Sequence, residues 1–140
     1  MGTRSLTFVY DGDTEKVGST VLCMYRHMDG YPSGHGKDLA EFILPFKIVN
    51  GLGGDGTHIA NGVGCFAAQI VAHFKEGPGG IYLKPARSTD CWQDYEYHVF
   101  VDDDDVHIRV KQNNGGGSRK KEIFFGNREK FLAFCTKEND

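Results

Sequence analysis

The 140-residue sequence has no closely spaced cysteines, no long apolar run and no surplus of basic residues. Its cysteines, Cys23, Cys65, Cys91 and Cys135, lie far apart without a neighbouring histidine pair, which excludes the usual zinc signatures. No stretch approaches the ~18 apolar residues of a membrane span. The first residues also lack the basic segment and apolar run of a secretion signal. We therefore expect a cytoplasmic protein with reduced thiols and no contact with a membrane.

The net charge of the chain argues against a protein that binds nucleic acid. The formal net charge is −3 and the isoelectric point is about 6.0, whereas a protein that coats phosphates needs a clear excess of Lys and Arg. The basic run Arg119–Lys121 is short, and we interpret it as a solvated strand or loop. With 39% hydrophobic and 12% aromatic residues, the composition is that of one ordinary globular domain, residues 1–140.

The spacing of apolar residues along the chain predicts which segments are strands and which are helices. β-favouring residues, mostly alternating apolar with polar, predict strands at 5–10, 20–26, 81–84, 95–101, 106–111 and 122–125. The first two strands should pair as a hairpin, and the last three should form an antiparallel meander with a turn at Asp102–Asp105. In the strand at 95–101, we expect Tyr95 and Tyr97 to belong to the core.

Helical spacing appears in three places. Leu39, Phe42, Ile43 and Phe46 share one face of a helix that begins at Lys37 and is ended or kinked by Pro45. A longer helix, capped by Thr57, carries Ile59, Val63, Phe66, Ile70 and Phe74. A final helix follows its cap, Asn127. The fold class is therefore α+β, a single domain with a largely antiparallel sheet of about five to six strands, two long helices and a short C-terminal helix on one face.

The segment from Tyr25 to Asp38 crowds ionisable side chains, aromatic rings and glycines between a strand and a helix. Glycine NH groups and a lysine at the start of a helix are features that attract an anion. A Walker loop is excluded, because Tyr31 stands where the first glycine should be and Asp38 replaces the magnesium-binding Ser or Thr. A competing interpretation is that the glycines only shape a turn.

The same segment offers His27 and Asp29 as candidates for acid/base catalysis. Two residues apart on an extended segment they would share a face, and the carboxylate could orient the imidazole. Alternatively, both side chains hold the loop through backbone hydrogen bonds. A metal set of His27, Asp29, His35 and His58 is conceivable but has no specific spacing, so we predict no metal ligand and no cofactor.

A resemblance to a known family rests on the motif YRHMDGYP, from Tyr25 to Pro32, and on Gly34 and Gly36 after it. Here the chain resembles a family of small uncharacterised proteins from bacteria and their phages, and the similarity extends over Asn61–Gln69 and Tyr95–Val99. The resemblance implies a bacterial or viral cytoplasmic context. It transfers no catalytic role, because no activity is established for that family.

The leading hypothesis is a non-catalytic, homo-oligomeric binding protein for an anionic small molecule, either a nucleotide or a phosphorylated metabolite. The predicted ligand-binding residues are Tyr25, Arg26, His27, Asp29, Gly30, Tyr31, Ser33, Gly34, His35, Gly36 and Lys37. Two alternatives stay open: a hydrolase or transferase that uses His27 as base with Asp29 orienting it, and a protein-interaction or structural subunit. The sequence does not decide whether the protein is an enzyme.

Overall fold

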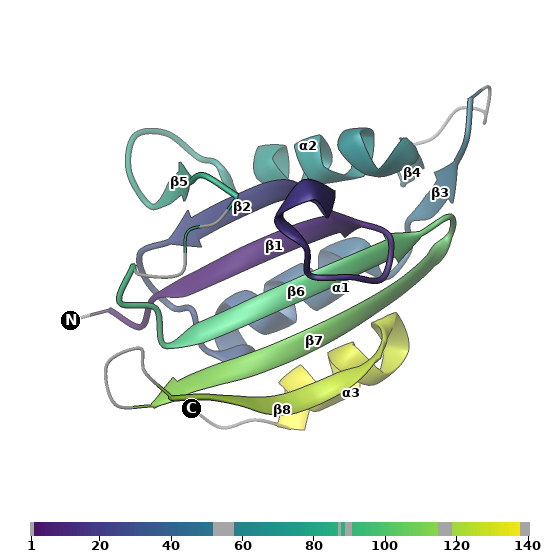
Figure 1. Cartoon of the computed structure of the whole chain (residues 1–140). Helices are drawn as coiled ribbons and strands as arrows, with labels where there is room; N and C mark the ends of the chain where they lie inside the picture. The colour runs from purple at the N-terminus through teal and green to yellow at the C-terminus, as the bar shows by residue number, and fades with distance from the viewer. Residues whose placement is uncertain (1, 52–57, 87, 89–90, 115–118, 138–140) are drawn as a thin grey trace.

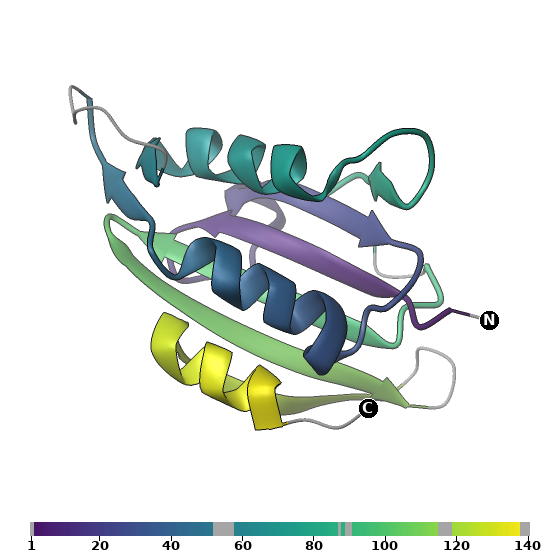
Figure 2. The same ribbon diagram turned by 180° about the vertical axis from the view of Figure 1, so that it is seen from behind.

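A six-stranded sheet, with its strands in the order β5-β2-β1-β6-β7-β8, forms the body of the molecule (Figure 1). The computed structural model describes residues 2–51, 58–86, 88, 91–114 and 119–137. Helices α1, α2 and α3 lie on one face of the sheet, as the view from behind shows (Figure 2). The fold is therefore the predicted α+β class, with a short helix at the C-terminal end.

The strands of the main sheet are β1 (Ser5–Asp11), β2 (Thr20–Arg26), β5 (Ile81–Leu83), β6 (Tyr95–Asp102), β7 (Asp105–Asn114) and β8 (Arg119–Asn127). A short 3-10 turn, η1 (Val17–Ser19), precedes β2. A π-helical turn, η2 (Pro32–Gly36), runs directly into α1 (Lys37–Ile43). The remaining elements are β3 (Lys47–Val49), β4 (Ile59–Asn61), α2 (Gly62–Phe74) and α3 (Arg128–Lys137).

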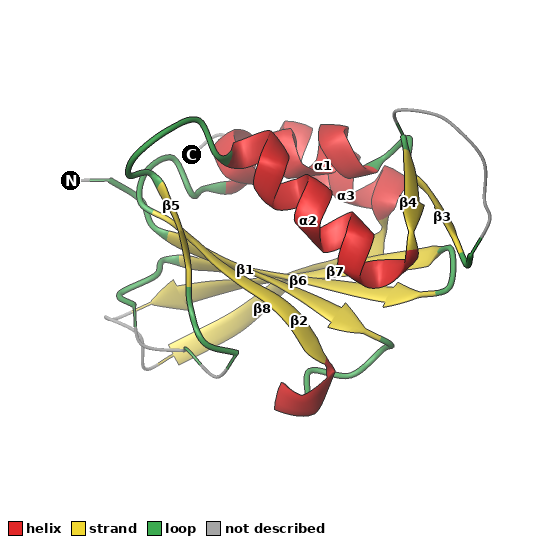
Figure 3. Cartoon of the chain, turned by 90° about the horizontal axis from the view of Figure 1, so that it is seen from above, coloured by secondary structure: helices red, strands yellow, loops and turns green. Residues whose placement is uncertain are grey.

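Apolar side chains fill both faces of the sheet, which explains why β1 is buried along almost its whole length. On the helix side, Val9, Val99 and Ile108 pack against Ile43 and Ile70 in the main core. The opposite face has a smaller cluster, in which Leu6, Phe8, Tyr10, Cys23 and Phe100 are buried. Alternation along a strand sends neighbouring residues to these two clusters. The view from above shows the helices on one side of the sheet and η1 on the other (Figure 3).

The hairpin and the meander predicted from alternation are confirmed. β1 pairs antiparallel with β2, and β6, β7 and β8 pair antiparallel in sequence order. The helix of Lys37 ends before Pro45, and the Asn127 Oδ1 atom accepts a hydrogen bond of 2.9 Å from the Lys130 NH as a cap. Tyr95 and Tyr97 are buried as expected.

The long helix begins later than predicted. Ile59–Asn61 forms β4, which pairs in parallel with β3, so α2 starts at Gly62. Gly62 has φ +83, a conformation that favours glycine, where the chain turns from strand to helix. The proposed cap, Thr57, lies outside the described residues. A second unpredicted feature is the parallel pairing of β1 with β6, which joins the two halves of the chain.

No helix in the described part of the chain is both long enough and apolar enough to cross a membrane.

The loop after β2 is packed closely on the start of β1. A Cβ atom on Gly30 would lie 2.8 Å from the Arg4 carbonyl carbon and 2.8 Å from the Ser5 Cβ atom. The Gly30 carbonyl also accepts a hydrogen bond of 2.7 Å from the hydroxyl of Tyr97 on β6. The close approach therefore ties the loop to two central strands at once.

Substituting Gly30 by alanine should lower the free energy of unfolding by about 1–3 kcal/mol, because backbone atoms must move to admit the methyl group. Gly64→Ala is the matched control. Gly64 lies exposed in α2 with nothing within 4 Å of an added Cβ, so alanine should stabilise the protein by about 0.5–1 kcal/mol. Urea unfolding should show that the free energy of unfolding decreases in Gly30→Ala and increases in Gly64→Ala. Equal effects would contradict the packing described for Gly30.

Candidate functional site

The segment between β2 and α1 forms a tight, internally hydrogen-bonded loop. The His35 NH donates to the Asp29 carbonyl at 2.8 Å, and the Gly34 NH donates to the Tyr31 carbonyl at 2.9 Å. The Gly30 NH donates to Thr3 at 2.8 Å. Glycine NH groups that were expected to reach a ligand therefore bond to the protein itself.

His35 is the centre of this loop and is fully buried. The Arg26 Nη1 atom lies 3.2 Å from His35 Nδ1, and the Thr7 Oγ1 atom lies 2.7 Å from Nε2. Because a guanidinium group can only donate, Nδ1 must accept, and the proton on Nε2 is donated to Thr7. Burial, assisted by the neighbouring Arg26 and His73, lowers the pKa of His35 to about 3. His35 is therefore neutral and holds Arg26 rather than supplying a charge.

Arg26 ends β2 with its guanidinium in a half-buried position. Its Nε atom donates to the Met28 carbonyl at 2.7 Å, and the guanidinium carbon lies 5.8 Å from the centre of the Phe74 ring. No carboxylate of the described residues lies within ion-pair distance of Arg26. Its hydrogen-bond acceptors among the described residues, His35 and the Met28 carbonyl, are uncharged, so the positive charge of Arg26 is not neutralised by a neighbour.

A pocket of about 400 Å³ opens beside this guanidinium, and we call it the Arg26 pocket. One wall is the end of β2 and the loop after it, Arg26–Met28. His73 and Phe74 at the C-terminal end of α2 also line it, together with Asp38 of α1. Residues 76–81, which run alongside the end of β2, complete the lining, and we call them the glycine-rich wall. The pocket thus lies where β2, α1 and α2 converge.

The glycine-rich wall contains three glycines with an unusual backbone conformation. Gly77, Gly79 and Gly80 all have positive φ, of 127, 78 and 76 degrees. Their NH groups donate to no acceptor among the described residues, although the Gly80 carbonyl accepts from the His27 NH at 2.9 Å. Unused NH groups on a backbone of this type can form a concave site for an anion. The backbone donors that were expected from Gly30–Gly36 are therefore available on a different loop.

The pocket also carries negative charge. The Asp38 carboxylate lies 2.9 Å from the His73 Nε2 atom. Glu76 on the glycine-rich wall is exposed and forms no hydrogen bond or ion pair with the other described residues. A ligand that places an anionic group at Arg26 and hydroxyl or amino groups near Glu76 would match this distribution.

Only some of the predicted ligand-binding residues line the Arg26 pocket. Arg26 and His27 line it, whereas Tyr25, Asp29, Gly30, Tyr31, Ser33, Gly34, His35, Gly36 and Lys37 do not. Tyr31 donates instead to the Asp29 carboxylate at 3.3 Å, and Tyr25 packs on Tyr82. No hydrogen bond or ion pair joins His27 to Asp29, although the structure describes both residues. The arrangement that a His27–Asp29 catalytic pair requires is not formed.

The part of the chain that the structure describes contains no group of three or more His, Cys, Asp or Glu side chains arranged to hold a metal ion.

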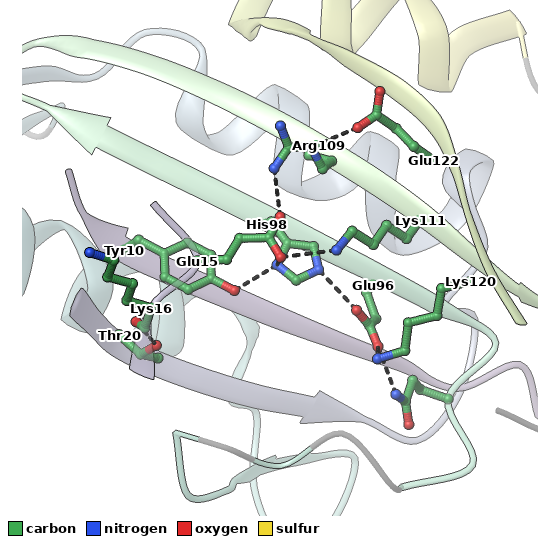
Figure 4. Close-up of polar contacts among 11 residues, drawn as sticks. Tyr10, Glu15, Lys16, Thr20, Glu96, His98, Arg109, Lys111, Lys120 and Glu122 are labelled. Atoms are coloured by element: carbon green, nitrogen blue, oxygen red, sulfur yellow. Dashed lines mark hydrogen bonds and ion pairs between the residues drawn. The ribbon is translucent and has the colours of Figure 1, made fainter. Parts of the chain in front are cut away.

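A second polar cluster, which sequence reasoning missed, lies on the opposite face of the sheet (Figure 4). His98 Nε2 lies 2.9 Å from Glu96 Oε1, and His98 Nδ1 lies 2.6 Å from the Tyr10 hydroxyl. Lys120 Nζ and Gln93 Nε2 each lie 2.8 Å from the other carboxylate oxygen of Glu96. All these side chains except Lys120 are buried.

The cluster holds the ionised carboxylate of Glu96 inside the protein. Burial opposes the ionised form of Glu96, but His98, Lys120 and Gln93 outweigh that effect and lower the pKa of Glu96 to about 2. Burial, followed by the charges of Glu15 and Glu96, raises the pKa of Tyr10. The alternation of Glu96 and His98 with buried tyrosines placed them on the second face of β6, but no local signal joins them to Tyr10, which is 88 residues from His98.

Comparison of the chain with models of protein families, with curated proteins and with solved structures finds no match. The resemblance of the Tyr25–Pro32 motif to a bacterial and phage family stays a prediction. Function must therefore be argued from the geometry of the site.

The buried, neutral His35 predicts how stability depends on pH. Its pKa falls from an ordinary value of 6.5 to about 3 in the folded protein, so between these values the unfolded chain binds a proton that the folded protein does not. Stability should fall as the pH drops below 6.5, with a contribution of up to about 1.4 kcal/mol per pH unit.

Replacing His35 by glutamine keeps an acceptor for Arg26 and a donor for Thr7 but removes the titrating group. Urea unfolding between pH 7 and pH 4.5 should therefore show a shallower loss of stability in His35→Gln than in the wild type. Parallel pH profiles for the two proteins would show that folding does not lower the pKa of His35.

Proposed function

We propose that the protein is a non-catalytic binding protein for an anionic small molecule, a nucleotide or a phosphorylated metabolite, which it holds in the Arg26 pocket. The observation that carries the proposal is the half-buried guanidinium of Arg26, which has only neutral acceptors and lines the same pocket as the glycine-rich wall. A charged group without a counterion favours a ligand of opposite charge, and arginine suits phosphate particularly well.

The phosphate of the ligand would accept hydrogen bonds from Arg26 and from the NH groups of Gly77, Gly79 and Gly80, and His27 would add a further donor. Ribose or sugar hydroxyls, or the amino group of a base, would donate to Glu76. Phe74 offers apolar surface in the lining of the pocket. A pocket of about 400 Å³ is within the range of small-molecule sites.

The alternatives from the sequence have less support. A hydrolase or transferase would need His27 and Asp29 in contact, and the structure does not join them. A structural subunit predicts no pocket at the Tyr25–Asp38 segment, and a pocket lies at one end of it. Homo-oligomerisation stays a prediction. So does the cytoplasmic location, which agrees with Cys23, Cys65 and Cys91 remaining outside disulfides.

Binding is tested by thermal shift and calorimetry with inorganic phosphate, adenosine monophosphate and glucose 6-phosphate. At least one compound should stabilise the wild type, by about 2.7 kcal/mol at a hundred times its Kd. The double variant Arg26→Gln, His27→Ala should bind it roughly tenfold or more weakly, because a charge-assisted hydrogen bond contributes about 1.5–3 kcal/mol.

Lys37→Ala is the matched control, because Lys37 is a cation of the same segment that does not line the pocket. Each variant is compared with its own ligand-free melting temperature. Lys37→Ala should keep the full response. The proposal fails if none of the compounds binds the wild type, or if the double variant binds as well as the control.

A further inference from the structure

The loop between β1 and β2 crosses the face of the sheet that lacks helices, and we call residues 12–19 the strap. In Figure 1 this loop passes in front of β1 and β6, and Figure 3 places its short turn, η1, on the side away from the helices. Most strap side chains are exposed, including Val17, and η1 buries no residue. The strap is therefore not held down by apolar contacts of its own side chains.

Glu15 is the strap residue whose side chain binds the sheet, while at the start of the strap the Gly12 NH donates to the Val101 carbonyl at 2.8 Å. The Glu15 carboxylate accepts from Arg109 Nη1 at 2.6 Å and from Lys111 Nζ at 2.9 Å, and it lies 3.9 Å from His98 Nδ1. Burial opposes the charged form of Glu15, but His98, Lys111 and Arg109 outweigh it and lower the pKa of Glu15. The carboxylate is thus firmly bound, although its own loop is exposed.

The groups that receive Glu15 belong to the rigid sheet. Arg109 and Lys111 alternate along β7, so they lie on the same face, and His98 is the partner of Arg109 on β6. The Arg109 guanidinium carbon lies 5.2 Å from the Phe100 ring centre and 4.9 Å from that of Phe125. These contacts do not involve the strap, so they hold the Arg109 guanidinium in place whether or not the strap is closed, as a prepared anion receptor requires.

A hollow adjoins this receptor. A pocket of about 300 Å³ is lined by Phe100, Arg109 and Phe125, and the Phe125 ring is 51% exposed. Asp13, Asp102 and Asp105 also line it and disfavour a ligand with several negative charges. The hollow therefore suits a single carboxylate attached to a flat apolar group that can stack on Phe125.

We infer that Arg109, Lys111 and His98 form a binding site for an aromatic monocarboxylate, which Glu15 occupies as an internal competitor while the strap is closed. When the strap lifts, the ligand carboxylate replaces that of Glu15, and its ring lies on Phe125. This site is on the opposite face of the sheet from the Arg26 pocket, so neither proposal depends on the other.

The test measures benzoate binding by NMR titration of the wild type and of Glu15→Ala. Removing the competing carboxylate should strengthen benzoate binding at least tenfold, with shifts at the Arg109 and Phe125 amides. Adding Lys111→Met to Glu15→Ala should reverse that gain. Glu122→Gln is the matched control: it removes the other carboxylate of Arg109, at 2.7 Å from Nε, but leaves the strap closed and should give no gain.

Glu15→Gln provides a second variant if the alanine protein is unstable, because its amide keeps the shape of the side chain without the charge. Benzoate should again bind more tightly than to the wild type. If neither Glu15 variant binds benzoate better than the wild type, or if Glu122→Gln gains as much, Glu15 is a structural clamp and the inference is wrong.

Discussion

The hydrogen-bonded chain from Thr7 through His35 to Arg26 is the constraint on which the candidate site depends. It joins the centre of β1 to the π-helical turn and then to the end of β2, within the core. Leaving one of its buried groups without a partner would cost about 1–3 kcal/mol, so the chain holds the guanidinium in one place. Because the groups that accept hydrogen bonds from Arg26 are neutral, they fix the position of its charge without cancelling it.

The arginines on the two faces of the sheet differ in the charge of their partners. Arg26, on the helix side, has neutral partners and a pocket of about 400 Å³ beside it. Arg109, on the other face, has two carboxylates, Glu15 and Glu122, which raise its pKa even though partial burial opposes the charged form. A ligand can therefore approach Arg26 directly, whereas at Arg109 it must first displace a side chain. This difference follows from which loops cross each face.

Local patterns predicted most of the fold, because strand alternation and glycine or proline stops are local properties. Thr20–Arg26 and the cap at Asn127 were predictable for this reason. The start of α2 was not, because Ile59 fits helical spacing with Val63 and only the pairing of β4 with β3 shows that it is a strand. The candidate site was predictable only in part. Arg26 and His27 could be predicted because they belong to a segment rich in ionisable residues and glycines. A Gly-Pro pair such as Gly77–Pro78 indicates from sequence only that a helix ends, and it is the fold that brings the glycine-rich wall into the same pocket as Arg26.

The central claim is that an anion binds to Arg26 and to the glycine-rich wall. The most direct measurement is an NMR titration of the wild-type protein with adenosine monophosphate, following backbone amides and the arginine Nε–H signals. The largest shifts should occur at the Arg26 side chain and at the amides of Gly77, Gly79 and Gly80. Saturable shifts confined to other residues, with these signals unmoved, would contradict this claim.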